Sequence, residues 1–379
     1  MKTILIFPFN LLSHYLRCLV LADSYPKDEY SIFFLSSDKY DHFINNHGYK
    51  TFSCRQFESD YVMACAKNFD FSWLGLNELE SILNSQMSVI NEFKADIVIG
   101  DVAPTLKMAA ELTHVNHISL MNGYMTRHYA FTRKVPKTHK AFKYLNILPE
   151  VLSDKITDLA EKRALRKIHE PFKSLRRKYG LQELADYSFE NEGNDNLICD
   201  LPSLFPQKLL PANYNYTGPL IYKYQDTEAD WLEEISLEKP VICVSMGSSG
   251  EWSRLSFLND SYYAKYTIIA AGDYKKVLHG THILSKDFVN LQNVLSKAAL
   301  LICHGGNGTI YLGILSNVYM LCLSSHFEQE WNIKAVEKNN FGKSADGFNE
   351  RNWKHHINQA IKLKYEYKNT TETGTELYS

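Results

Sequence analysis

Short apolar runs alternate with longer amphipathic stretches along the first third of the chain. The runs predict buried strands over residues 3–7, 30–35, 97–99 and 117–120, and the stretches predict helices over 14–25, 78–93 and 105–112. The same alternation resumes after Gly218-Pro219, with further apolar runs over 240–245, 266–270, 300–303 and 318–323. Strands that alternate with helices are typical of parallel sheets. We therefore expect an α/β protein built from two doubly wound domains.

The length of the chain also favours two domains. A single core rarely grows beyond about 250 residues, and this chain has 379. The polar stretch over 222–239 is the predicted linker, between an N-terminal domain over 1–221 and a C-terminal domain over 240–368. Helical spacing predicts a last helix over 353–368, and a polar, mobile tail follows over 369–379. Doubly wound sheets bind ligands beyond the carboxyl ends of their strands, so the cleft between the domains is the expected active site.

The bulk composition is that of an ordinary globular protein and argues against two classes of partner. A net charge of -2, without a recognised binding module, argues against nucleic acid. No apolar stretch reaches the roughly 18 residues needed to cross a bilayer, and the first strand is too short for a signal-peptide core. The seven cysteines are scattered and form no C-x-x-C pair, so neither zinc nor a redox centre is indicated. A reduced, cytoplasmic location is the simplest interpretation.

A glycine-rich segment carries the strongest chemical signal. Residues 303–309 read Cys-His-Gly-Gly-Asn-Gly-Thr and follow an apolar run, which predicts a strand, a tight turn and the start of a helix. Glycines let the backbone approach an anion closely, and free N–H groups at a helix N-terminus carry a partial positive charge. This arrangement favours a diphosphate site, with His304 and Thr309 as side-chain donors. A tight connection that binds no ligand has the same pattern, so the segment indicates a phosphate site only if other motifs of the chain support it.

Polar side chains follow other predicted strands as well. Ser13-His14 follows the first strand, Asp101 follows the strand over 97–99, and Gly247-Ser248-Ser249-Gly250 follows the first strand of the second half. Taken singly, His14 also fits a capping or surface histidine, Asp101 fits a helix N-cap, and residues 247–250 fit an ordinary turn. Parallel strands gather their carboxyl ends at one edge of a sheet, so the joint placement indicates a site.

These motifs resemble those of the UDP-glycosyltransferase superfamily, inverting enzymes with the GT-B fold, and the similarity covers most of the chain. The matching segments, in order, are Tyr216-Thr217-Gly218-Pro219, Val244-Ser245-Met246-Gly247-Ser248, Phe288-Val289-Asn290-Leu291, Val294-Leu295, His304-Gly305-Gly306-Asn307-Gly308-Thr309, Glu328-Gln329 and Asn332. The resemblance implies two Rossmann-like domains that face a central cleft. It also implies transfer of a sugar from a nucleoside diphosphate sugar, a UDP- or TDP-sugar, to a hydroxyl of a small aromatic or apolar acceptor.

The resemblance further implies roles for individual residues. His14 matches the family's catalytic base, and Asp101 matches the aspartate that orients its imidazole. Phe288 stands where the family has a tryptophan against the base of the nucleotide. The donor-binding positions carried over from the family are Ser248, Ser249, Phe288, Val289, His304, Gly306, Asn307, Gly308, Thr309, Glu328 and Gln329.

The absence of an Asp-x-Asp sequence bears on metals and cofactors. Without this motif we expect no metal clamp on the diphosphate, and His304 together with a helix dipole would replace it. The nucleotide sugar is a co-substrate, so no cofactor is expected.

Some positions depart from the family's pattern. Leu312 stands where the family has a glutamate that contacts both ribose hydroxyls, and a leucine cannot accept those hydrogen bonds. Ribose recognition is therefore weakened or moved, with Tyr311 as one replacement. Asn290 and Leu291 replace the usual Pro and Gln beside the base, which leaves the class of base open.

The segment Ser13-His14-Tyr15-Leu16-Arg17-Cys18 departs from the common Gly-His-x-x-Pro opening. It is closer to the Gly-His-x-x-Arg-Cys opening of a related GT-B group that includes nucleotide-sugar hydrolases, in which water replaces the acceptor alcohol. A hydrolase of this fold is therefore the main alternative. A second alternative, from another class, is a non-catalytic auxiliary or binding protein, which Leu312 favours and the retained pair of His14 and Asp101 disfavours.

The acceptor side offers weaker signals. Tyr124 and His128, with the aromatic stretch 69–73, are candidates for an acceptor pocket, although such residues suit a core equally. Residues 127–178 are rich in lysine and arginine and poor in acids. Such a segment fits solvated helix faces, an anionic or lipid-like acceptor, or peripheral contact with an acidic membrane surface.

Overall fold

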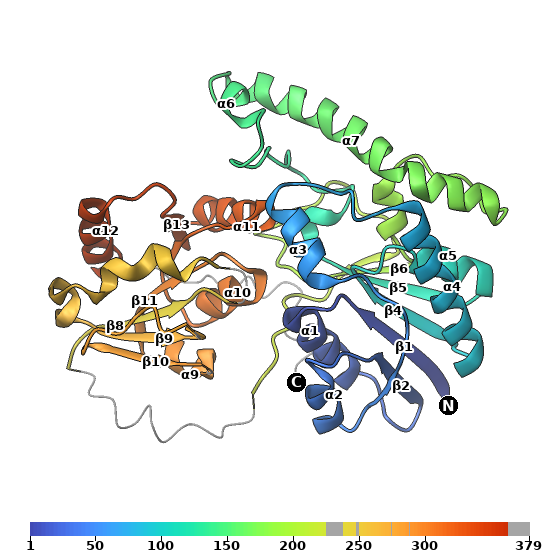
Figure 1. Cartoon of the computed structure of the whole chain (residues 1–379), viewed down its shortest axis with the longest axis horizontal. Coiled ribbons are helices and arrows are strands. Elements are labelled where there is room, and N and C mark those ends of the chain that lie inside the picture. The colour runs from blue at the N-terminus through green and yellow to red at the C-terminus, as the bar shows by residue number, and fades with distance from the viewer. Residues whose placement is uncertain (225–237, 248–249, 274, 288, 363–379) are drawn as a thin grey trace. The chain divides into compact units, whose positions relative to one another are not determined.

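The computed structural model describes residues 1–224, 238–247, 250–273, 275–287 and 289–362 (Figure 1). The chain divides into two compact units, Met1–Tyr222 and Lys223–Thr370. Most of the predicted linker, the end of the predicted last helix and the predicted tail lie outside the described residues. Each unit holds one parallel sheet, which confirms the expected α/β class.

The sheet of the first unit has the strand order β3-β2-β1-β4-β5-β6-β7, and its strands pair in parallel. The strands are β1 (Lys2–Pro8), β2 (Tyr30–Leu35), β3 (Lys50–Phe52), β4 (Ile97–Asp101), β5 (Asn116–Met121), β6 (Asp195–Ile198) and β7 (Tyr214–Tyr216). The α-helices are α1 (Leu12–Asp23), α2 (Asp41–Asn46), α3 (Ser59–Lys67), α4 (Leu76–Phe93), α5 (Leu106–Thr113), α6 (Phe142–Leu145) and α7 (Glu150–Lys178), and the 3₁₀ helices are η1 (Gly123–Met125) and η2 (Tyr187–Asn191). The strand order reverses between β1 and β4, and doubly wound sheets bind ligands at such a switch point.

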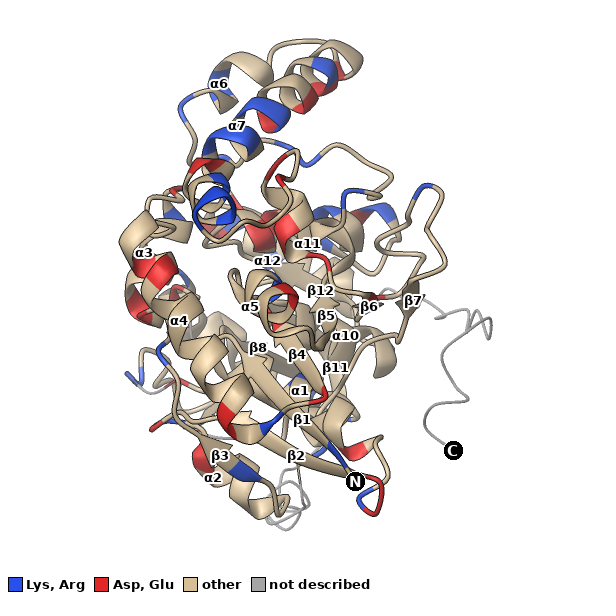
Figure 2. Cartoon of the chain, turned by 90° about the vertical axis from the view of Figure 1, so that its right-hand side faces the viewer, with Lys and Arg blue, Asp and Glu red and all other residues tan. Residues whose placement is uncertain are grey.

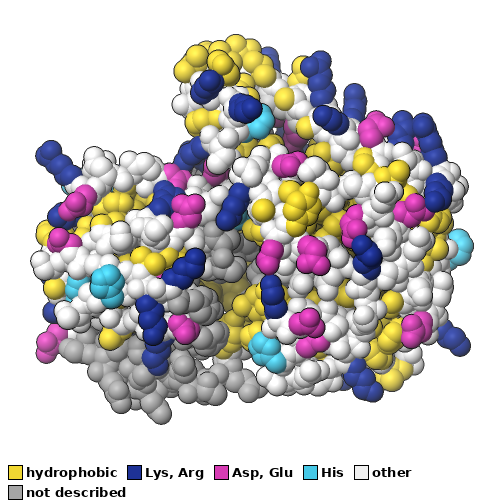
Figure 3. Space-filling view, viewed as in Figure 1, with side chains coloured by type: hydrophobic (Ala, Val, Ile, Leu, Met, Phe, Trp, Pro, Cys, Tyr) yellow, Lys and Arg dark blue, Asp and Glu magenta, His cyan; other side chains and the backbone are white. Residues whose placement is uncertain are grey.

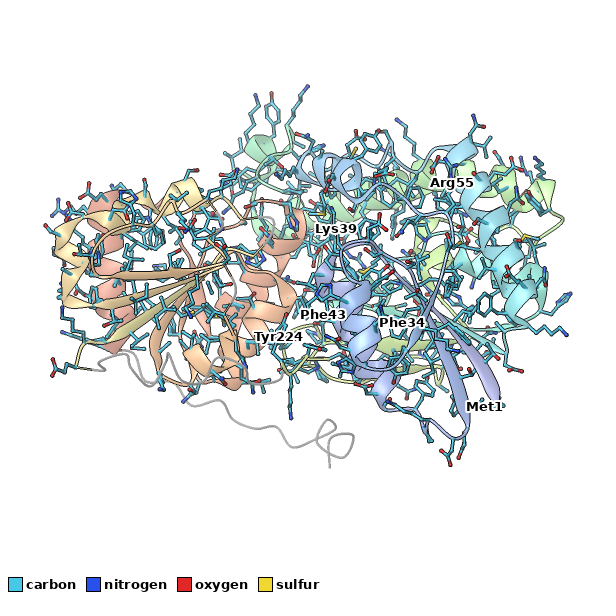
Figure 4. The ribbon with its side chains drawn as sticks, turned by 60° about the horizontal axis from the view of Figure 1, so that its bottom comes forward. Met1, Phe34, Lys39, Phe43, Arg55 and Tyr224 are labelled. Atoms are coloured by element: carbon cyan, nitrogen blue, oxygen red, sulfur yellow. The ribbon has the colours of Figure 1, made fainter. Side chains whose placement is uncertain are left out.

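Both faces of this sheet are covered, which explains why its strands read as continuous apolar runs. Leu5 and Phe7 of β1 belong to the core cluster that contains residues of α4 and α5. Ile4 and Ile6 belong to a second cluster with residues of α1. Phe34 of β2, labelled in Figure 4, lies in this second cluster. Successive residues of β1 therefore serve opposite cores, as the alternation of side chains along a strand requires.

The sheet of the second unit has the strand order β10-β9-β8-β11-β12-β13, again parallel. Its strands are β8 (Val241–Ser245), β9 (Thr267–Ala271), β10 (Ile283–Lys286), β11 (Ala298–Cys303), β12 (Met320–Cys322) and β13 (Gly342–Ser344). Its described α-helices are α9 (Leu291–Leu295), α10 (Asn307–Leu315), α11 (Phe327–Lys338) and α12 (Glu350–Lys362), and its 3₁₀ helices are η3 (Trp252–Asn259) and η4 (Ser261–Lys265). The second switch point lies between β8 and β11.

The strands and helices predicted from the apolar pattern are present, with ends displaced by a few residues. The predicted last helix begins earlier than expected, at Glu350. The strands β3, β6, β7, β10 and β13 were not predicted. Each is only three or four residues long and lies at or next to a sheet edge, where one-sided burial gives a weak hydrophobic signal.

Helix α7 is anchored through its C-terminal half. The fully buried Arg176 donates to Glu190 (Nε to Oε1, 2.6 Å) and to Glu111 (Nη1 to Oε2, 2.8 Å). His169 Nε2 lies 2.8 Å from the same oxygen of Glu190. Buried charges are stable only when paired and hydrogen-bonded, so this network fixes where the helix leaves the unit. Helix α6 and the N-terminal half of α7 extend away from the sheet (Figures 1 and 2).

Replacement of Arg176 by Met should destabilise the protein by about 3 to 5 kcal/mol, because Glu190 would remain buried without its guanidinium partner. The matched control is Arg177→Met, which removes an ion pair with Glu183 from a side chain that is 62% exposed and should cost at most about 1 kcal/mol. Urea titration followed by circular dichroism measures both. Equal costs for the two variants would show that the buried network does not anchor α7.

Candidate active site

The strand register brings His14 and Asp101 together in the first unit. His14 lies in the first turn of α1, directly after β1, and Asp101 is the last residue of β4. Because Pro8 pairs with Asp101 across the two parallel strands, both side chains stand at the same sheet edge. His14 Nδ1 lies 2.9 Å from Asp101 Oδ1, and the side chains are 16% and 0% exposed, respectively. The ring of Phe9 packs edge-on against the imidazole of His14.

A third side chain, Arg17, shares the carboxylate. It follows His14 by about one helical turn, and its guanidinium donates to both carboxylate oxygens of Asp101 through Nε and Nη2. Its Nη1 donates to Asn122 Oδ1 at 2.9 Å, and its Nη2 lies 3.1 Å from His14 Nδ1. Sequence reasoning assigned no role to Arg17. The only signal was its place in the unusual segment after His14.

The charge of Asp101 depends on these neighbours. Burial by itself would raise the pKa of this carboxyl group, but the charges of Arg17 and His14 and their hydrogen bonds outweigh burial and lower the pKa to about 2. Asp101 is therefore ionised at neutral pH and can accept a hydrogen bond from the Nδ1–H of His14. In the tautomer that donates this hydrogen bond, the lone pair lies on His14 Nε2, the nitrogen that faces away from the carboxylate.

The backbone next to Asp101 is strained. Val102 has a φ of 55°, which is unusual for a β-branched residue and costs on the order of 1 to 3 kcal/mol. The strain redirects the chain immediately after the carboxylate. Such strain persists only where surrounding packing holds it, and it is concentrated at functional sites.

In the second unit, three loops meet at the carboxyl edge of the sheet. Strand β11 lies between β8 and β12, with Cys303 opposite Ser245 on one side and opposite Cys322 on the other. The segments that follow these three strands therefore lie next to one another. They contain Gly247, His304 and the start of α11, so the register gathers the described parts of the predicted donor site.

The glycines of this site are required by close approach to His304. A Cβ on Gly306 would lie 2.3 Å from His304 Nε2, and one on Gly247 would lie 2.8 Å from the same ring. Gly305 has a φ of +79°, and a Cβ there would also lie 2.7 Å from Ile333. The ring of His304 is thus wedged against backbone, which fixes its orientation.

His304 is uncharged at neutral pH. Burial is the main cause that lowers its pKa, to about 4. Its Nδ1, with Ser325 Oγ and Asn332 Oδ1, is buried without a hydrogen-bond partner among the described residues. Unpaired buried polar atoms are costly. Asn332 Oδ1 can only accept, so it requires a donor such as a ligand hydroxyl, whereas the hydroxyl of Ser325 can also donate to an anionic oxygen. His304 therefore offers hydrogen bonds rather than positive charge, which refines the expectation that it would replace a metal clamp.

The remaining predicted donor residues are placed unevenly. Gly306 is the N-cap of α10 and has no side chain that could cap the helix. The first turn of α10 is formed by Asn307, Gly308 and Thr309, so their backbone amides lie at the N-terminus of the helix. Gln329 is 1% exposed, and its Oε1 accepts a hydrogen bond from the backbone N–H of Ser325 at 2.7 Å. The side chain thus braces the loop after β12.

Other positions separate into three groups. Glu328 is half-buried in the first turn of α11, and Val289 is 7% exposed. Ser248, Ser249 and Phe288 lie outside the described residues. Tyr311 is 0% exposed within α10, so its ring is core, and the suggestion that it replaces the ribose-binding glutamate is wrong.

Tyr124 and His128 have packing roles in this structure. Tyr124 is 5% exposed and packs edge-on against Phe205. His128 packs edge-on against Tyr214. Burial of this kind leaves little of the Tyr124 ring for an acceptor, so for Tyr124 the packing supports the alternative interpretation as core, whereas His128 is half-buried.

A different hollow lies beside His14. A cavity of about 30 Å³ is lined by Phe7, Phe9, Phe57 and Val102, among others. It shares Arg55, Gln56 and Phe57 with an open groove of about 810 Å³. The groove is also lined by Tyr61, Trp73 and Leu76. The aromatic stretch over 69–73 therefore contributes Trp73 to a surface groove, whereas the groove residues of α3 and α4 were not predicted.

Comparisons with known proteins identify relatives that act on sugars. No family model matches the chain. A PGL/p-HBAD biosynthesis rhamnosyltransferase of Mycobacterium bovis (strain BCG / Pasteur 1173P2) is 22% identical over 348 residues, which cover 86% of this chain and 73% of the relative. A PGL/p-HBAD biosynthesis glycosyltransferase of Mycobacterium tuberculosis (strain ATCC 25177 / H37Ra) is 24% identical over 341 residues, which cover 86% and 76%.

Solved structures of glycosyltransferases share the fold over nearly the whole chain. The glycotransferase of kitacinnamycin has a TM-score of 0.72 and 14% identity, with 96% of this chain and 91% of that chain covered. The spinosyn rhamnosyltransferase SpnG, complexed with spinosyn aglycone, has a TM-score of 0.65 and 14% identity, with 95% and 92% covered. The glycosyltransferase SsfS6 of Streptomyces sp. SF2575, complexed with thymidine diphosphate, has a TM-score of 0.63 and 11% identity, with 95% and 96% covered. These findings agree with the resemblance that the motifs indicate: this chain has the GT-B fold, and its sequence is similar to those of glycosyltransferases.

Proposed function

We propose that the chain is an inverting glycosyltransferase that moves a sugar from a nucleoside diphosphate sugar to an acceptor hydroxyl, with His14 as the general base. The observation that carries this proposal is the 2.9 Å contact between His14 Nδ1 and Asp101 Oδ1 at the switch point of a parallel sheet. A base whose other nitrogen is held by an ionised carboxylate is the arrangement that proton abstraction from an alcohol requires.

On the acceptor side, His14 Nε2 takes the proton as the hydroxyl oxygen attacks the anomeric carbon. The imidazolium that forms is stabilised by Asp101, which stays ionised because its pKa is lowered to about 2. General base catalysis of this kind contributes about 10² to 10⁴ in rate. Arg17 holds the carboxylate from its other side, so it acts on the reaction through Asp101 rather than on the substrate.

On the donor side, the leaving diphosphate would be held by hydrogen bonds. The backbone amides at the start of α10 and the neutral ring of His304 provide donors, and the helix dipole adds a partial positive charge. These groups are the basis for proposing transfer without a metal ion. Thymidine diphosphate bound to SsfS6, a protein of the same fold, supports a UDP- or TDP-sugar as donor.

For the acceptor we propose an aromatic or apolar molecule that enters through the groove lined by Phe57, Tyr61 and Trp73. The groove shares Arg55, Gln56 and Phe57 with the cavity that borders Phe9, and Phe9 contacts His14. Flat aromatic walls bind flat or apolar groups by burial and offset stacking. The spinosyn aglycone bound to SpnG is consistent with a small-molecule acceptor for this fold.

Replacement of His14 by Ala should lower the rate of sugar transfer by about 10² to 10⁴ and leave nucleotide binding nearly unchanged, because His14 stands in the first unit and the nucleotide site in the second. Product formation is followed by mass spectrometry, and nucleotide binding by calorimetry. The matched control is His47→Ala, since His47 Nδ1 also contacts a carboxylate, Asp23, at 2.9 Å. Transfer at the wild-type rate by the His14 variant would refute the assigned base.

Replacement of Arg17 by Met should move the acid limb of the pH–rate profile upward. Without the guanidinium, burial would dominate and raise the pKa of Asp101, by about 1 to 3 units, and a protonated Asp101 cannot accept the hydrogen bond from His14 Nδ1. Arg17→Lys keeps the positive charge and should restore part of the profile. If Arg17 were only a structural support, both variants would lose activity equally at every pH.

Replacement of Gly306 by Ala should weaken nucleotide binding about tenfold or more, because the new Cβ would displace the His304 ring and its hydrogen bonds. The internal control is a double-mutant cycle with His304→Ala. If the glycine variant acts by moving His304, the double variant should bind no more weakly than either single variant. Additive losses, measured by calorimetry with UDP and TDP, would contradict this cause.

A further inference from the structure

The arm formed by α6 and the N-terminal half of α7 exposes apolar side chains. Of the large apolar side chains that are exposed in the described part of the chain, more than half lie between residues 131 and 159. Those on the arm are Tyr144 (63% exposed), Ile147 (79%), Val151 (70%), Leu152 (47%), Ile156 (41%) and Leu159 (53%). Figure 3 shows hydrophobic side chains gathered on the projecting end of this arm. Contiguous exposed apolar surface of this kind marks an interaction site.

The amphipathic pattern of this part of α7 is reversed relative to a core-facing helix. Thr157 is buried, and Asp154 and Glu161 are half-buried on the same side of the helix. The two acids pair with basic residues of the preceding loop, Asp154 with Lys134 and Glu161 with Arg133 (2.8 Å). Polar side chains therefore face inward, and the apolar ones are left for solvent. None of these apolar residues is among the described members of the core clusters of the first unit.

Basic side chains surround the apolar ones. Lys140, Lys143, Lys155, Lys162 and Arg163 are all exposed, and no ion pair joins them to the described residues. The same stretch exposes two acids, Glu150 and Asp158. Because these are fewer than the exposed lysines and arginine, the surface keeps a net positive charge. Lysines and arginines can be followed along α6 and α7 in Figure 2.

The two halves of α7 differ in how their cations are used. In the C-terminal half, Lys173, Arg176, Arg177 and Lys178 pair with glutamates of the first unit. Those cations are engaged in ion pairs, of which the buried one at Arg176 anchors the helix. The broad basic segment over 127–178 thus resolves into an anchored part and a part whose charges remain available.

We propose that the arm docks on the surface of an anionic lipid bilayer, with Tyr144, Ile147, Val151, Leu152, Ile156 and Leu159 at the level of the headgroups and the surrounding cations on lipid phosphates. This set of residues is the docking face. Aliphatic side chains bury area in the interface, Tyr suits its mixed polarity, and long cationic side chains reach the phosphates. No helix among the described residues is long and apolar enough to cross a membrane, so the contact is peripheral.

Charge favours a bilayer over a second copy of the chain. A two-fold interface would place the same surface of both copies together, and the cations around the docking face would then repel one another. An anionic bilayer instead complements them. The arm extends away from the sheet of its unit (Figure 1), and this projecting position also suits a flat partner. This docking is independent of the proposed sugar transfer.

Vesicle flotation tests the proposal with the full chain. Wild-type protein should float with vesicles of phosphatidylcholine mixed with phosphatidylglycerol, and far less with phosphatidylcholine alone. Added salt should weaken binding because it screens the cations. Ile147→Ser with Val151→Ser should weaken binding about tenfold or more, and Lys155→Gln with Lys162→Gln about tenfold.

The matched control removes exposed apolar side chains elsewhere. Leu209 and Leu315 are 94% and 56% exposed, and Leu209→Ser with Leu315→Ser should bind anionic vesicles as the wild type does. Circular dichroism verifies that every variant is folded. Absence of flotation by the wild type, or equal flotation by all variants, would overturn the proposal. Sedimentation velocity provides a second test, since a dimer that Ile147→Ser with Val151→Ser dissolves would assign the face to self-association instead.

Discussion

The candidate site of the first unit depends on one buried charge, the ionised carboxylate of Asp101. It stands at the end of a central strand with 0% exposure, where burial alone would favour the neutral acid. Arg17 and His14 keep it ionised, and both come from the first helix, so a strand register and one helical turn are enough to assemble the three groups. A carboxylate that is neutralised on one side by a fixed cation keeps its charge while it orients an imidazole on the other.

The second unit also has a buried polar site at the carboxyl edge of its sheet, but the residue at its centre, His304, is neutral. Three adjacent parallel strands end beside one another, and the loops that follow them bring glycines within contact of His304. The ring is buried and neutral, so it can offer hydrogen bonds without carrying a charge that burial would penalise. Both units thus use the carboxyl edge of a parallel sheet, one to bring His14 against an ionised carboxylate and the other to gather backbone amides and buried polar atoms around His304.

Periodicity was sufficient to predict the central strands of both sheets, and strand ends indicated a site at His14, Asp101 and the turn at His304, because side chains that follow parallel strands must gather at one edge. The pairing of His14 with Asp101 was implied by the resemblance to the glycosyltransferase superfamily. The role of Arg17 could not be predicted, since it depends on a through-space contact with a strand 84 residues further along the chain. Tyr124 was ambiguous for a related reason. An aromatic residue after a strand looks the same in a core and in a pocket, and only its packing on Phe205 separates the two.

The most direct test of a sugar transfer based on His14 is the release of nucleoside diphosphate from a panel of UDP-, TDP- and GDP-sugars, each with and without a pool of phenolic and lipid acceptors. A transferase predicts rapid release from at least one donor only when an acceptor is present, and no such release by the His14→Ala variant. Rapid release in buffer alone would contradict this account and indicate a nucleotide-sugar hydrolase. Binding of nucleotide without release from any donor would contradict it as well, and would indicate a protein that keeps the fold without turnover.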